Sequence, residues 1–157
     1  MNKLLLWCFA VIMSCANAPS QSSQKTSDMQ TKAEILVSES QGGADRPGFV
    51  MIRNQQELDE AVKKNFDAAG MERELESHYP KFPKNRKVVL YNLGTFNSGD
   101  HKITTIKNIS VKNNVLYVEV PQYDSGGMAI HVMSNPWIIF TVPSEYQFNS
   151  VEIKSSK

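Results

Sequence analysis

The sequence predicts a mainly β (α+β) domain with a helical insert: an antiparallel β-sandwich or open barrel with one or two short helices. Three observations support this fold class. Short β-rich segments recur about every 10 residues in the second half of the chain, and Gly, Pro and Asn separate them. One earlier segment has helical periodicity. A length of 157 residues suits one domain, and Lys+Arg 17 against Asp+Glu 16 gives no electrostatic reason to expect a nucleic-acid partner.

The expected strands are apolar or β-branched runs bounded by turn residues. They are residues 33–38, 48–53, 87–93, 102–111, 115–120, 128–133, 137–142 and 149–154. The apolar residues of 102–111 break strict alternation, which predicts a β-bulge near 104–107. Asn113 and Asn114 tolerate positive φ and are expected to close a two-residue hairpin into the next strand.

One helix is expected over residues 55–66, between the second and third strands. Asn54 can cap its free amides, and Glu57 three residues later completes a pattern like a capping box. The apolar stripe that would face a core consists of Leu58, Ala61, Val62 and Phe66. A second short helix is expected around residues 71–77, ending at the prolines that follow.

The first fifteen residues have the layout of a secretory signal, with Lys3 before an apolar stretch over 4–13. Ser14-Cys15 resembles the end of a bacterial lipobox, so residues 1–15 are interpreted as a lipoprotein signal peptide and Cys15 as the lipidated residue. One alternative is cleavage after Ala18 and ordinary secretion, although Pro19 would follow that cut and signal peptidase tolerates proline there poorly. A second alternative is an uncleaved anchor. No apolar run reaches the ~18–20 residues of a membrane-spanning helix.

The mature chain is expected to divide into a flexible tether over 16–32 and a single β-rich domain over 33–157. Because Ala16 rather than Asp follows Cys15, the outer membrane is the expected location, with a periplasmic or secreted soluble protein as the alternative. The chain's only cysteines are Cys8 and Cys15, so the mature domain has no disulfide and no cysteine nucleophile or metal ligand.

Two loops carry the candidate functional residues. Aromatic and small polar side chains on the loops of a rigid sandwich are typical of protein-binding surfaces. The candidates are Phe96, Asn97, Ser98, Gly99, Asp100 and His101 on one loop and Tyr123 and Asp124 on another.

Catalytic and metal-binding interpretations of the same regions have less support. Ser98, Asp100 and His101 are the residue types of a hydrolytic triad, but the chain has no G-x-S-x-G pattern, and we expect no catalytic residue. Met128, His131 and Met133 could suit cuprous copper, yet strand alternation would bring only His131 and Met133 to one face. We therefore expect neither a metal nor another cofactor.

A succession of strands and turns in the second half of the chain is similar to a known family. It consists of Phe82, then residues 87–94 (KVVLYNLG), 98–103 (SGDHKI), Ile109, 115–120 (VLYVEV), 135–140 (NPWIIF) and Val142-Pro143. The region from about residue 50 to 153 thereby resembles the C-terminal domain of the PrcB family, whose members are accessory lipoproteins associated with a secreted surface protease complex. That family typically has Thr-Gly-Gly-Tyr where this chain has Ser98-Gly99-Asp100-His101.

The resemblance and the loops together predict a non-enzymatic envelope lipoprotein. Its expected partner is another envelope or surface protein that it would assist or stabilise, and a protease is one candidate. The membrane is reached through the lipid anchor alone, and nucleic acid is not expected. The alternatives are a peptidase inhibitor of a chagasin-like kind, which would also present a glycine-containing turn near an aromatic loop, and a small ligand- or metal-binding module.

Overall fold

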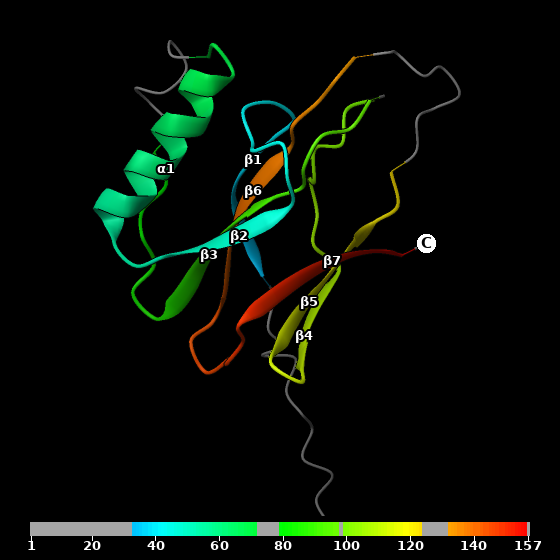
Figure 1. Cartoon of the computed structure of the whole chain (residues 1–157). Helices are drawn as coiled ribbons and strands as arrows, with labels where there is room; N and C mark the ends of the chain where they lie inside the picture. The colour runs from blue at the N-terminus through cyan, green and yellow to red at the C-terminus, as the bar shows by residue number, and fades with distance from the viewer. Residues whose placement is uncertain (1–32, 72–78, 98, 124–131, 157) are drawn as a thin grey trace, which may run out of the picture.

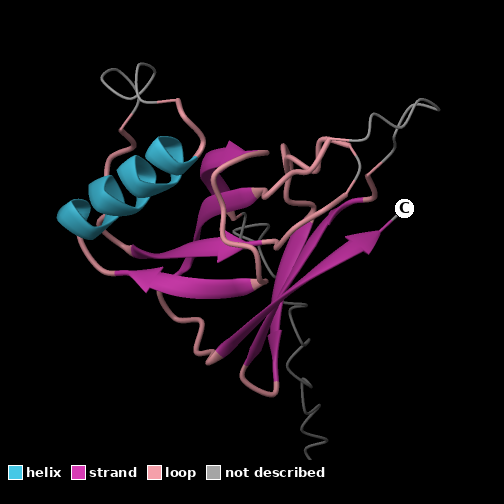
Figure 2. Cartoon of the chain, turned by 45° about the horizontal axis from the view of Figure 1, so that its top comes forward, coloured by secondary structure: helices cyan, strands magenta, loops and turns pink. Residues whose placement is uncertain are grey.

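The computed structural model describes residues 33–71, 79–97, 99–123 and 132–156. They form three layers, with one helix against a sheet and a second sheet against the other face of the first (Figure 1, Figure 2). The four-stranded sheet has the order β1-β6-β3-β2, and the three-stranded sheet has the order β4-β5-β7. The elements are β1 (Glu34–Glu39), β2 (Gly48–Ile52), α1 (Gln55–Ala68), β3 (Arg86–Asn92), β4 (Asn108–Lys112), β5 (Val115–Pro121), β6 (Trp137–Pro143) and β7 (Ser150–Ser156). The predicted β-sandwich with a helical insert is confirmed.

The central strand β6 explains how two cores share one sheet. All of its residues are buried, and its sequence is an almost continuous apolar run. Because side chains alternate along a strand, Trp137 and Ile139 face α1, whereas Ile138 and Phe140 face the three-stranded sheet. A strand covered on both faces has no exposed face that needs a polar residue, hence the absence of alternation in its sequence.

The helix α1 begins as the sequence predicts. The Glu57 amide donates to the Asn54 side chain at 2.9 Å, and the Glu57 carboxylate accepts from the Arg53 amide at 2.8 Å. The predicted apolar stripe is confirmed, since Leu58 and Val62 are 0% and 2% exposed in the core between α1 and the sheet. Within the described residues, no helix is long and apolar enough to cross a membrane.

The predicted hairpin between β4 and β5 is confirmed, with φ of 52° at Asn113 and 61° at Asn114. The carbonyl of Asn114 also accepts from the Asn149 amide at 2.9 Å, which joins this turn to the residue before β7. The short turn therefore fixes the register of two strands and the start of a third.

One detail of the predicted sheets is wrong. The pairing is not antiparallel throughout, because β5 and β7 are parallel. Between them the chain crosses to the four-stranded sheet as β6 and returns, so it re-enters the second sheet in the direction of β5. The two sheets do not form a closed barrel.

The predicted strand over 102–111 is also wrong in its first half. Only Asn108–Lys112 forms a strand, and residues 102–107 are irregular, so no bulge lies at 104–107. This segment links β3 of one sheet to β4 of the other, with Ile103 buried between the sheets. Most of the predicted strand 128–133 and of the predicted helix 71–77 lies outside the described residues. The described residues of these two segments, Val132, Met133 and Met71, belong to no helix or strand.

Candidate functional site

The site consists of three aromatic rings from two loops, which we call the aromatic cluster: Phe96, His101 and Tyr123. The imidazole of His101 lies between the other two rings. Its centroid is 3.9 Å from that of Phe96 with an interplanar angle of 22°, and 4.2 Å from that of Tyr123 with an angle of 33°. Tyr123 is 40% exposed, so the cluster is partly open to solvent.

The backbone around Phe96 holds the first ring in place. Phe96 and Ser134 exchange two backbone hydrogen bonds of 2.9 Å as an isolated β-bridge. The Ser134 hydroxyl, which is buried, donates to the carbonyl of Gly99 at 3.1 Å. Ser134 therefore holds the loop that carries Phe96 at two points, Phe96 and Gly99.

A close approach between Gly99 and Tyr123 joins the two loops. Gly99 has a φ of +81°, and a Cβ at this position would lie 2.2 Å from the Tyr123 hydroxyl oxygen. The same hydroxyl accepts from the Asp100 amide at 3.1 Å. A glycine is needed here for two reasons, its left-handed backbone and the space that Tyr123 occupies.

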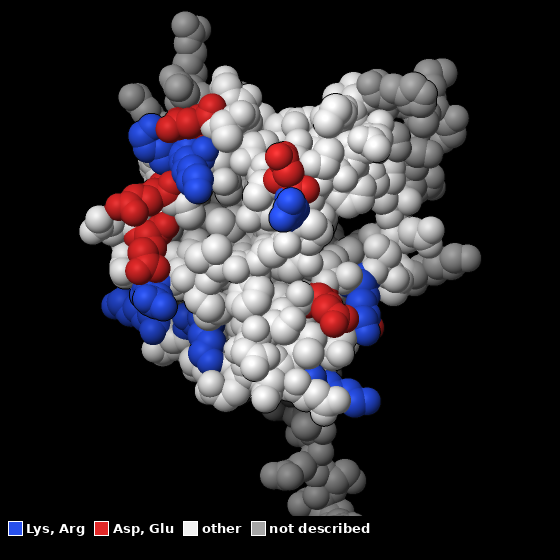
Figure 3. Space-filling model, viewed as in Figure 1, with Lys and Arg blue, Asp and Glu red and all other residues white. Residues whose placement is uncertain are grey.

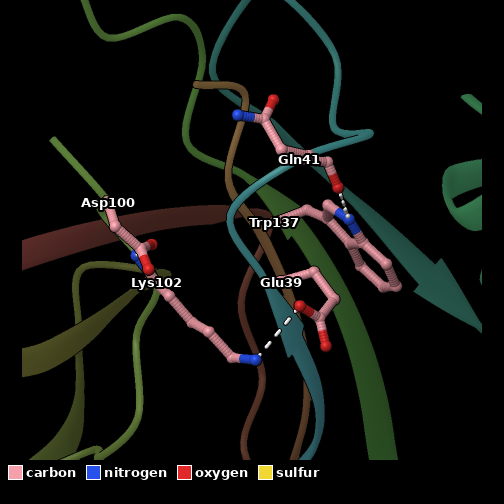
Figure 4. Close-up of polar contacts among 5 residues, drawn as sticks. All are labelled: Glu39, Gln41, Asp100, Lys102 and Trp137. Carbon is pink, nitrogen blue, oxygen red and sulfur yellow. Dashed lines mark hydrogen bonds and ion pairs between the residues drawn. The ribbon is translucent and has the colours of Figure 1, made fainter. Parts of the chain in front are cut away.

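Lys102 ties the loop to the four-stranded sheet. Its amide donates to the Asp100 carboxylate at 3.0 Å, and its ammonium group lies 3.0 Å from the carboxylate of Glu39 on β1 (Figure 4). The Lys102 side chain is 38% exposed and that of Glu39 26%, so solvent screens this ion pair and we assign it a positioning role.

The neighbouring loop before β2 is held by a separate set of contacts. The Trp137 indole donates to the carbonyl of Gln41 at 2.8 Å (Figure 4), and the Asn135 amide group donates to Asp45 and Thr95 at 3.1 Å and 2.9 Å. Polar groups at the ends of the strands are thus used to fix the loops.

Beside the aromatic cluster lies a cleft of about 390 Å³, a size within the ~300–1,000 Å³ of ligand pockets. Its apolar wall comes from both sheets, with Tyr91 on β3, Val120 on β5 and Ile153 on β7. Phe96, His101 and Tyr123 also line it. Burial raises the pKa of the Tyr91 phenol, and the nearby carboxylate of Glu152 raises this pKa further.

The structure brings together most of the candidate residues that it describes. Phe96, Gly99, Asp100 and His101 meet Tyr123 from the other loop. Asn97 is exposed on the same loop. Cys15, Ser98 and Asp124 lie outside the described residues.

Sequence reasoning missed the residues that support the cluster. Ser134 carries no motif, and its contact with Phe96 joins positions 38 residues apart, so no local pattern could have identified it. The cleft was missed for the same reason, since its wall comes from strands of two sheets.

The described residues do not contain a cluster of three or more His, Cys, Asp or Glu side chains able to hold a metal ion. Of the residues considered for copper, Met128 and His131 are not described. Met133 is 64% exposed, and its carbonyl accepts from the Gln41 side chain.

Comparison of the chain with family models, curated proteins and solved structures returned no match. The resemblance to the PrcB family therefore stays a prediction from the sequence.

Proposed function

We propose that this chain is a non-enzymatic, protein-binding lipoprotein of the bacterial envelope and that its partner contacts the aromatic cluster and the adjacent cleft. The observation that carries the proposal is the packing of three rings, from loops more than twenty residues apart, at the edge of a cleft. The centroid of the His101 ring lies 3.9 Å from that of Phe96 and 4.2 Å from that of Tyr123. Aromatic side chains give large contact areas at low entropic cost and are enriched among the residues that dominate protein interfaces.

Preorganisation supports the same proposal. Ser134, Gly99 and Lys102 fix the two loops through backbone and side-chain contacts, so binding would not have to order them. A surface that is already ordered loses less conformational entropy when a partner binds. The rings of Phe96 and Tyr123 flank the His101 imidazole, and the Asp100 carboxylate accepts from the Lys102 amide. This arrangement suits recognition better than proton transfer.

The envelope location and the type of partner rest on the sequence. The lipobox-like residues before Cys15 support lipid anchoring, and the resemblance to the PrcB family supports an accessory or stabilising subunit, for which a surface protease is the first partner to test. The described domain would then present the aromatic cluster to that partner.

A protease inhibitor is the second candidate. The turn at Gly99 lies directly beside Phe96 and Tyr123, an arrangement that a chagasin-like inhibitor could insert into a protease cleft. An inhibitor would reduce the activity of papain-like or serine proteases when mixed with them, whereas an accessory subunit would co-purify with a protease that remains active.

The proposal is tested by affinity purification of the chain from its native envelope, with mass spectrometry of the co-purified proteins. We expect Phe96→Ala and His101→Ala each to reduce recovery of the partner at least about tenfold, because truncating a dominant interface residue costs about 2 kcal/mol or more. Both residues are partly exposed, so the thermal midpoint should change little.

Phe148→Ala is the matched control. Phe148 is also partly buried and also lies near a second ring, 6.4 Å from Phe49, but it belongs to the loop between β6 and β7. It should leave partner recovery at the wild-type level. Unchanged recovery with both Phe96→Ala and His101→Ala would exclude the aromatic cluster as the contact surface.

A further inference from the structure

The strand β2 is an outer strand of the four-stranded sheet, and its own sequence lacks the residues that usually protect such an edge. It pairs with β3 on one side, and no strand of the described chain pairs with it on the other. Its sequence, GFVMI, contains no charged residue and no proline, which are the residues that normally prevent edge strands from pairing with other chains. The other outer strands all carry charges: Glu34 and Glu39 on β1, Lys112 on β4, and Glu152 and Lys154 on β7.

One apolar side chain along this edge is exposed. Val50, at the centre of β2, is 55% exposed, although its neighbour on the same face, Ile52, is buried against α1. A hollow of about 270 Å³ lies between the strand and the helix, lined by Val50, Met51, Ile52, Leu90, Ala61, Glu57, Glu60 and Lys64. In the surface view charged side chains of both signs gather over α1, and a smaller charged group lies beside one end of β2, while the rest of the area over the strand is uncharged (Figure 3).

We propose that β2 pairs with β2 of a second copy of this chain, antiparallel and about a two-fold axis through Val50, to join the two four-stranded sheets into one. In this register Gly48 faces Ile52, Phe49 faces Met51 and Val50 faces itself, so no like charges meet. A self-complementary interface of this kind is what two-fold symmetry requires.

The charges beside the hollow favour a second copy over an unrelated strand. Glu57 lies in the first turn of α1 and Glu60 about one turn later, and Lys64 follows about one turn after Glu60; all three line the hollow. The two-fold axis reverses the direction of the second helix, so the acidic end of one hollow lies toward the basic end of the other. The pairing uses none of the residues of the aromatic cluster.

The symmetry gives a direct test by cross-linking. Residues that face each other in antiparallel strands have Cα atoms about 4.5–5.5 Å apart, within the range of about 4.4–6.8 Å that a disulfide spans. We expect the full-length Val50→Cys chain, purified in detergent, to form a disulfide-linked dimer under mild oxidation, seen by non-reducing electrophoresis. Ser110→Cys is the matched control because Ser110 is exposed at the centre of the outer strand β4. The wild-type chain measures the background from Cys8 and Cys15.

A charged variant tests the same contact without cross-linking. Val50→Lys would place two ammonium groups opposite each other at the axis, so sedimentation should show the wild type as a dimer and the variant as a monomer. The circular dichroism spectrum of the variant should remain that of the folded domain. A wild type that is monomeric at every concentration overturns the proposal. A chain whose edge pairs only with a strand of another protein would give this result. Equal cross-linking of Val50→Cys and Ser110→Cys, or a dimeric Val50→Lys chain, overturns it as well.

Discussion

Replacement of Trp137 by alanine is expected to destabilise the domain more than truncation of any of its partly exposed aromatic side chains. Trp137 is 1% exposed, packs edge-on against Phe66 of α1 at 5.8 Å between ring centroids, and donates its indole N–H to the carbonyl of Gln41. Truncation of a buried Trp typically costs about 3–5 kcal/mol because it combines lost burial with a residual cavity. Equilibrium denaturation in urea measures this loss.

Two further variants separate the causes. Trp137→Phe keeps a ring against Phe66 but leaves the carbonyl of Gln41 without its donor, so its loss of stability should be smaller than that of Trp137→Ala. Tyr79→Ala removes an aromatic side chain that is 39% exposed and should change stability by less than about 0.5 kcal/mol. An unfolding free energy of Trp137→Ala equal to that of the wild type would contradict the packing of α1 on β6.

The second large effect is expected from Gly99→Ala, which should disrupt the aromatic cluster. The φ of +81° disfavours any side chain by about 1–2 kcal/mol. The new Cβ would also lie 2.2 Å from the Tyr123 hydroxyl oxygen, so this ring must move away from His101. The rings beside His101 should shift its imidazole protons upfield in proton NMR spectra of the wild type, and these protons should return toward ordinary values in Gly99→Ala.

Gly70→Ala is a close control for the backbone. Gly70 has a φ of +70°, but a Cβ there meets nothing within 4 Å. It should therefore lose only the backbone part of the stability, about 1–2 kcal/mol, with unchanged His101 resonances. The contact of Gly99 with Tyr123 would be refuted by an upfield His101 signal that persists in Gly99→Ala.

Local sequence patterns predicted the start of the helix and one hairpin of this fold. Asn54 and Glu57 marked the start of α1, and the pair Asn113-Asn114 marked the hairpin between β4 and β5. Both features depend on hydrogen bonds or dihedral angles within a few residues, which is why they can be recognised without knowledge of the tertiary structure.

Features that depend on distant parts of the chain were not predictable in the same way. The parallel pairing of β5 with β7 follows from the path of β6 through the other sheet, and residues 102–107 are irregular because they connect the two sheets. The composition of two loops identified Phe96, His101 and Tyr123 as candidates, but not that their rings stack. That contact requires the bridge between Phe96 and Ser134 and the approach of Gly99 to Tyr123.

Photo-cross-linking from position 123 tests most directly whether the aromatic cluster binds a partner protein. A benzophenone-bearing phenylalanine in place of Tyr123, and separately in place of Tyr79, samples two tyrosines of nearly equal exposure, 40% and 39%. After irradiation of the native envelope, the chain substituted at position 123 should be cross-linked to a second protein, which mass spectrometry identifies. The chain substituted at position 79 should not be cross-linked. Equal cross-linking from both positions, or none from position 123 in a chain with a wild-type thermal midpoint, would contradict a partner contact at the aromatic cluster.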